Sequence, residues 1–164
     1  MPSESTEELI FQNIESELKE ITAGTTYWYT PKVVRADQFS REVLEGHSSK
    51  VIYVIRDTSE SAIVPPERSF GKNAKLLTAF VLLAFKDERA SDDPYSMKAP
   101  VKGTIRHRMI RDVEIKLNED GTRGGNAEWT LMDTITKDFD EGVGPWVIAE
   151  VAANVQYQHS YDAP

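Results

Sequence analysis

Apolar residues recur at helical spacing near the start of the chain and predict an amphipathic helix over residues 5–23. Ser5 or Thr6 is suited to cap its first turn, and Gly24 is suited to end it. The stripe consists of Leu9, Ile10, Ile14, Leu18 and Ile21. Glutamates occupy the opposite face, so we expect this helix to bury only one side.

A second helix is predicted over residues 101–117, where apolar side chains recur at every fourth position. These positions are Val101, Ile105, Met109, Val113 and Leu117, and Ile110 widens the stripe. Basic residues fill much of the remaining surface of this predicted helix.

Five other segments are rich in β-branched, aromatic or alternating apolar residues and predict strands. Two of them, residues 50–56 and 75–86, are apolar on both faces, which is typical of strands inside a sheet. The five are expected at residues 25–35, 50–56, 75–86, 129–136 and 146–157.

This order of elements predicts an α+β fold, a mostly antiparallel sheet flanked by two main α-helices. The 164 residues suit a single domain covering positions 1–164. Residues 58–74 are irregular and predict an extended loop or hairpin arm that reaches a neighbour or partner. The polar residues 158–164 predict a flexible tail.

The composition removes several classes of function. With 19 Lys+Arg against 27 Asp+Glu the net charge is −8, which argues against a general nucleic-acid-binding protein. The absence of cysteine excludes disulfides, zinc–thiolate sites, iron–sulfur clusters and cysteine nucleophiles. The first residues lack the features of a secretory signal, and the longest apolar run is too short to cross a bilayer, so we expect no membrane association.

The charge is unevenly distributed between the two predicted helices. Residues 3–20 hold six glutamates and one lysine, and residues 98–116 hold six basic and two acidic residues. The candidate interface residues are Lys98, Lys102, Arg106, Arg108 and Arg111 on the basic side, and Glu15, Glu17 and Glu20 on the acidic side. Phe70, in the predicted arm, completes the set.

Three interpretations of the basic helix remain open: a solvated face, contact with DNA phosphates, or pairing with the acidic helix of a neighbouring subunit. The overall negative charge favours pairing over DNA binding. Opposite charges on two helices of one chain favour head-to-tail association, which is the type of contact that builds rings.

No residue pattern indicates catalysis. His47, His107 and His159 are far apart, without a second ligand at metal-binding spacing. The acidic clusters at residues 92–93 and 138–141 lie in polar, turn-rich stretches where carboxylates are common. Neither Gly71-Lys72 nor the glycines of residues 121–125 have the context of a phosphate-binding loop. We therefore expect no enzyme activity, no catalytic residues, no cofactor and no metal.

Several segments, taken in order, resemble the tail terminator (tail completion) proteins of long-tailed bacteriophages. The N-terminal helix leads into residues 21–27 and then 30–35. Later, a helix ends at residues 110–117, the glycine-containing turn 120–127 precedes a strand, and a closing strand ends in Val155-Gln156-Tyr157.

The resemblance implies an α+β subunit that forms a homo-hexameric ring at the head-proximal end of the tail tube. Such a ring stops polymerisation of the tail tube protein and offers a docking surface to the neck or head-closure protein. DNA passes through its lumen without sequence-specific binding. The implied location is the virion, and the host cytoplasm during assembly.

Two other functions remain open at this point. The chain could be a different connector component, such as a head-closure, neck or tail tube protein. It could also be a small ligand-binding or enzymatic α+β domain with a pocket beneath the aromatic segment Tyr27-Trp28-Tyr29.

Overall fold

The computed structural model describes residues 4–37, 49–56, 72–87, 101–135 and 146–160. The helices are α1 (Thr6–Lys19) and α3 (Lys102–Glu119). The strands are β1 (Lys32–Ala36), β2 (Lys50–Arg56), β3 (Lys72–Lys86), β4 (Trp129–Ile135) and β5 (Trp146–Ser160). They form one sheet in the order β1-β2-β3-β5-β4, in which only the β1–β2 pair is parallel. The predicted α+β fold is confirmed.

Helix α1 begins where the sequence predicts it but ends at Lys19, with Glu20 as its C-cap, so the predicted end at Gly24 is wrong. The Ser5 hydroxyl accepts a hydrogen bond from the Glu8 backbone N–H at 3.2 Å, which satisfies one donor that the first turn leaves without an intrahelical partner. Glu7 and Glu8 lie at the positive end of the helix dipole and Lys19 at the negative end. The apolar stripe is buried, and its most enclosed members include Ile10, Ile14 and Leu18.

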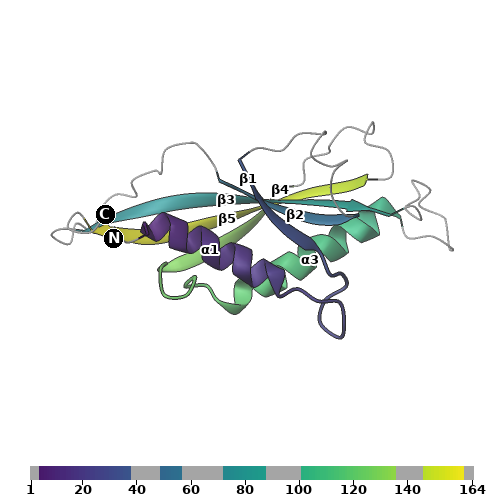
Figure 1. Cartoon of the computed structure of the whole chain (residues 1–164), viewed down its shortest axis with the longest axis horizontal. Coiled ribbons are helices and arrows are strands. Elements are labelled where there is room, and N and C mark those ends of the chain that lie inside the picture. Colours follow the sequence, from purple (N-terminus) through teal and green to yellow (C-terminus); the bar gives the residue numbers. More distant parts are fainter. Residues whose placement is uncertain (1–3, 38–48, 57–71, 88–100, 136–145, 161–164) are drawn as a thin grey trace.

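Both helices lie on the same side of the sheet (Figure 1). Between them and the strands lies the main core, to which β3 contributes residues such as Leu83 and α3 contributes Ile105, Met109, Val113 and Leu117. The first position of the predicted stripe, Val101, is instead the half-buried N-cap of α3. A smaller apolar cluster, containing Tyr53 and Leu82, lies on the other face of the sheet. The long β3–β5 pair runs through the middle of this arrangement.

The structure corrects the strand predicted to start at residue 25. Residues 24–26 form a turn inside an isolated bridge between Ala23 and Tyr27, residues 28–30 belong to no strand, and β1 begins only at Lys32. Pro31 has no backbone N–H to contribute to a ladder. The N–H groups of Trp28 and Tyr29 donate to the Asp112 side chain. The aromatic residues predicted a strand here, but two of the backbone N–H groups donate to a side chain of α3 and not to a neighbouring strand.

The structure also corrects the start of the third predicted strand and the end of the fifth, because the two strands pair further than predicted. Residues 72–74, assigned to the predicted arm, begin β3, and residues 158–160, assigned to the predicted tail, end β5. The two ends pair with each other, Lys72 opposite Ser160 and Ala74 opposite Gln158. Polar side chains obscured these strand ends in the sequence. Backbone pairing across the sheet defines them.

Several predictions fall on positions outside the described residues. They include the rest of the 58–74 arm and of the 158–164 tail, and the acidic clusters at 92–93 and 138–141. The individual candidates concerned are Phe70, Lys98 and His47.

Candidate protein-interaction site

The basic residues predicted on one helix have different surroundings in the structure. Arg106 is half-buried, and its Nε donates a hydrogen bond to the Ile148 carbonyl oxygen at 3.1 Å. Lys102 is also half-buried and has polar interactions of its own. Arg111, by contrast, is exposed. The basic side chains of α3 therefore do not form one uniform solvated face.

The acidic candidates on α1 are paired within the chain. Glu15 contacts Lys19 at 2.6 Å and Arg35 at 3.3 Å. Glu17 and Glu20 both contact the Lys116 ammonium group, at 3.4 and 2.8 Å. The opposite charges of the two helices thus attract each other inside one subunit.

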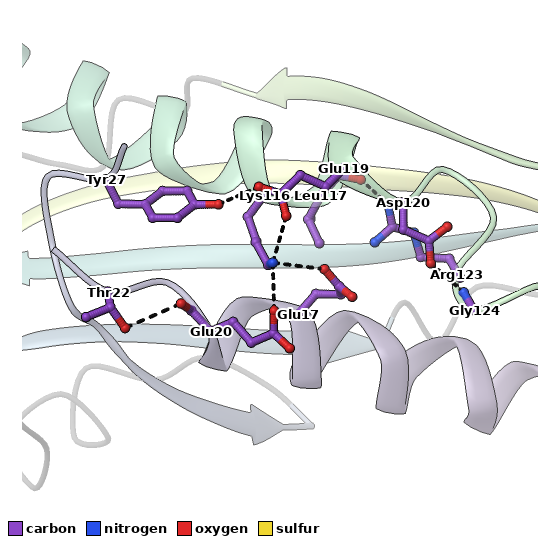
Figure 2. Close-up of polar contacts among 10 residues, drawn as sticks. All are labelled: Glu17, Glu20, Thr22, Tyr27, Lys116, Leu117, Glu119, Asp120, Arg123 and Gly124. Atoms are coloured by element: carbon purple, nitrogen blue, oxygen red, sulfur yellow. Dashed lines mark hydrogen bonds and ion pairs between the residues drawn. The ribbon is translucent and has the colours of Figure 1, made fainter. Parts of the chain in front are cut away.

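Lys116 is the centre of this ionic network (Figure 2). Its side chain is only 9 % exposed, and it also contacts Glu119 at 2.8 Å. Hydrogen bonds to Glu119 and Glu20 raise the pKa of Lys116 above its ordinary value. The hydrogen bond from Lys116 in turn lowers the pKa of Glu119. Tyr27 joins the network by donating its hydroxyl hydrogen to Glu119 at 2.7 Å.

A second network fixes the turn that precedes β1. The Asp112 side chain, 3 % exposed, accepts hydrogen bonds from the Trp28 N–H at 2.9 Å and the Tyr29 N–H at 3.0 Å. Burial raises the pKa of the Asp112 carboxyl, and the two backbone donors oppose that shift. The Tyr29 ring packs edge-on against Phe85, with the centroids 4.9 Å apart. These contacts hold Trp28 and Tyr29 of the aromatic segment against α3 and β3.

The Trp28 ring projects from this fixed turn. It is 52 % exposed, and the Arg108 guanidinium lies 4.1 Å from its centre, within range of a cation–π interaction. Arg108 and Arg111 are three residues apart on α3 and therefore neighbours on its surface. We refer to Trp28, Arg108 and Arg111 as the Trp28 surface.

A second exposed apolar group lies on β4, at the edge of the sheet. Trp129 is 42 % exposed and Leu131 is 60 % exposed, and Asp133 follows on the same face. The intervening Thr130 and Met132 pair with core residues of β5, so the three exposed side chains point away from the helices. We refer to Trp129, Leu131 and Asp133 as the β4 surface.

The turn between α3 and β4 contains a buried arginine. Arg123 is fully buried with a φ of 51°, and its Nε donates to the Thr130 hydroxyl at 3.0 Å. Its Nη2 donates to the Leu117 carbonyl oxygen near the end of α3. The Asp120 carboxylate accepts from the Gly124 N–H at 2.6 Å. These contacts set the path from α3 into β4 and so the position of the β4 surface.

Sequence reasoning singled out none of Asp112, Lys116 and Arg123. For the first two a signal was present, because Asp112 follows Met109 by three positions and Lys116 follows Val113 by three. Both charged residues thus fall on the buried stripe of the predicted helix. For Arg123 no such signal exists, since it lies among polar turn residues.

Within the described ranges, no group of three or more His, Asp or Glu side chains is placed to hold a metal ion. None of the helices in the described part of the chain has the length and hydropathy to span a membrane. No protein-family model matches the chain, and no curated protein is significantly similar to it. The function therefore has to be inferred from the geometry of the two surfaces.

Proposed function

We propose that this chain is a structural subunit of a bacteriophage virion, a tail terminator that forms a homo-hexameric ring at the head-proximal end of the tail tube. The observation that carries the proposal is the presence on one subunit of two different surfaces, each with an exposed large apolar side chain. The exposed large apolar side chains of the described residues, Trp28, Trp129 and Leu131, all belong to these two surfaces.

A subunit with two different contact surfaces can bind its neighbours head to tail. Such a contact closes into a ring when the rotation between subunits allows it. The Trp28 surface lies beside α3, on the helix-covered side of the sheet, whereas the β4 surface faces the other side. Within one subunit the two surfaces therefore do not cover each other, which favours contact with a neighbouring subunit.

The arrangement of the elements also supports the resemblance to tail terminators. The segment 110–117 lies in α3, the segment 120–127 is the turn that leads into β4, and Val155-Gln156-Tyr157 belongs to the closing strand β5. In the proposed ring, the head-proximal face binds the neck or head-closure protein and the opposite face binds the tail tube protein. The net charge of −8 favours a lumen that repels DNA and lets it slide.

Electron microscopy of the purified protein, alone and mixed with tail tube protein of the same phage, tests this proposal. We expect six-fold rings, and tail tubes that carry the protein at one end and stop elongating. A matched reaction with bovine serum albumin controls for crowding of the tube ends. Tubes that elongate normally, with no protein bound at their ends, would contradict the proposed function.

A further inference from the structure

We infer that the Trp28 surface of one subunit binds the β4 surface of a second copy of this chain. This inference rests on the proposed ring and specifies which residues form its repeating contact. It combines three independent observations: a pre-organised anchor, an uncovered edge strand and complementary charges.

The first observation is that Trp28 is held in place before any partner binds. Its backbone N–H is bonded to the buried Asp112 carboxylate, and its ring is stacked on Arg108. Ordering an interface side chain on association costs conformational entropy, and here most of that ordering has occurred in the free subunit. Tryptophan and arginine are also the residue types most enriched at the energetic centres of interfaces.

The second observation is the exposure of β4. Among the described strands it has one neighbour, β5, and its outward face carries a tryptophan and a leucine. An apolar edge strand of this kind promotes uncontrolled aggregation unless something covers it. A specific partner for Trp129 and Leu131 is therefore expected.

The third observation identifies the partner as a second copy. Arg111 on the Trp28 surface and Asp133 on the β4 surface are both exposed, and within the described residues neither has an ion-pair partner. Most of the other charged side chains of α1 and α3 described above form ion pairs or hydrogen bonds within the chain. Charge pairs of this kind fix orientation and exclude wrong partners more than they add affinity.

Two variants, each altered on one surface, test the inference. Variant A combines Trp28→Ala and Arg111→Glu, and variant B combines Leu131→Ser and Asp133→Lys. Trp28→Ala keeps the backbone N–H that Asp112 binds, and Leu131 is mostly exposed, so thermal melting should show that both variants fold. Lys32→Glu, at an exposed position of β1, makes the same charge change as Arg111→Glu and serves as the matched control.

Light scattering and sedimentation measure the masses of the assemblies in solution. If the wild type assembles only on tail tubes, electron microscopy of tubes mixed with each variant replaces these measurements. We expect rings for the wild type and the control, and monomers for A alone and B alone. A mixture of A and B should give a one-to-one dimer and nothing larger, because each retains one intact surface. Either variant assembling by itself, or a mixture that stays monomeric, would overturn the assignment of surfaces.

The same measurements separate this inference from the proposed function. Rings formed by the wild type and equally by both variants leave the ring in place and refute these contact residues. A wild type that remains monomeric both in solution and on tail tubes refutes the ring, and with it the contact.

Discussion

The Asp112 carboxylate accepts the backbone N–H of Trp28 with both oxygens, at 2.9 and 3.1 Å. A carboxylate is unfavourable in a buried position unless its hydrogen bonds are satisfied, and here a turn provides the donors. The result is a buried acid that holds an exposed aromatic ring in one place. This relationship links the core of the subunit to the surface that we propose for assembly.

Replacing Asp112 with alanine should reduce the free energy of unfolding by about 1–3 kcal/mol, since the partly buried N–H donors of Trp28 and Tyr29 lose their acceptor. Urea unfolding measures the change. Asp37→Ala, a matched substitution at an exposed position outside both proposed contact surfaces, should alter stability by no more than about 0.5 kcal/mol. Equal losses of unfolding free energy in the two variants would show that the Asp112 hydrogen bonds do not stabilise the fold.

Lys116→Met should destabilise the protein by about 1–2 kcal/mol, because it leaves Glu17, Glu20 and Glu119 close together without their shared cation. Added salt should reduce the loss, since it screens the remaining repulsion. The control is Lys19→Met, which removes an exposed pair with Glu15 and should change stability by less than about 0.5 kcal/mol. Identical salt responses in both variants would contradict the proposed network.

The difference in stability between the wild type and Lys116→Met should also depend on pH. The pKa of Glu119 is lowered in the folded state. Its contribution to the free energy of unfolding is therefore present above the ordinary pKa of 4.5 and is lost as the pH falls through the lower pKa of the folded state. The raised pKa of Lys116 keeps its own contribution intact below the ordinary lysine value of 10.5. Urea titrations should therefore show a constant difference from neutral pH to about pH 10, and a shrinking one below pH 4.5.

Arg123→Met should lower the free energy of unfolding by about 2–4 kcal/mol, since the hydrogen bonds to Thr130 and Leu117 are lost in a buried place. Lys32→Met, at an exposed position outside both proposed contact surfaces, should be close to neutral. Hydrogen exchange offers a local check, because amides at the start of β4 should lose protection in the Arg123 variant. Unchanged protection there would show that Arg123 does not position β4.

Gly125→Ala should cost about 1–2 kcal/mol, because residue 125 has a φ of +83°, a conformation that disfavours a Cβ. Among the described residues, no atom lies within 4 Å of the position that this Cβ would occupy, so the cost is one of backbone conformation. Gly121→Ala is the matched control, with equally open space and no such φ, and should be nearly neutral. Thermal melting of the two variants compares the two positions, and equal melting temperatures would contradict a conformational cost at residue 125.

Local sequence patterns predicted the elements well. The predicted stripes mark the buried sides of α1 and α3, except that their first members, Leu9 and Val101, are only half-buried. Ser5 caps α1 as expected. Alternation along residues 146–157 identified the face of β5 that lies beneath the helices. Such predictions succeed because helical and strand periodicity record, residue by residue, which side of an element is removed from water.

Contacts between segments far apart in the chain could not be predicted from these local patterns. The position of β5 between β3 and β4, and the extra pairs from Lys72 to Ser160, depend on which strands meet in the sheet. The segment 25–30 has the composition of a strand, yet a carboxylate 84 positions away takes the Trp28 donor. Backbone hydrogen bonding leaves no local trace when its acceptor is far along the chain.

The charges show the same division. Composition and spacing revealed an acidic helix and a basic helix in one chain, together with the absence of cysteine. Folding then paired Lys116 with Glu17 and Glu20, stacked Arg108 on Trp28 and left Arg111 exposed. A charged side chain has the same sequence signature whether water or another residue surrounds it, so its surroundings are set only when the helices and the sheet pack together.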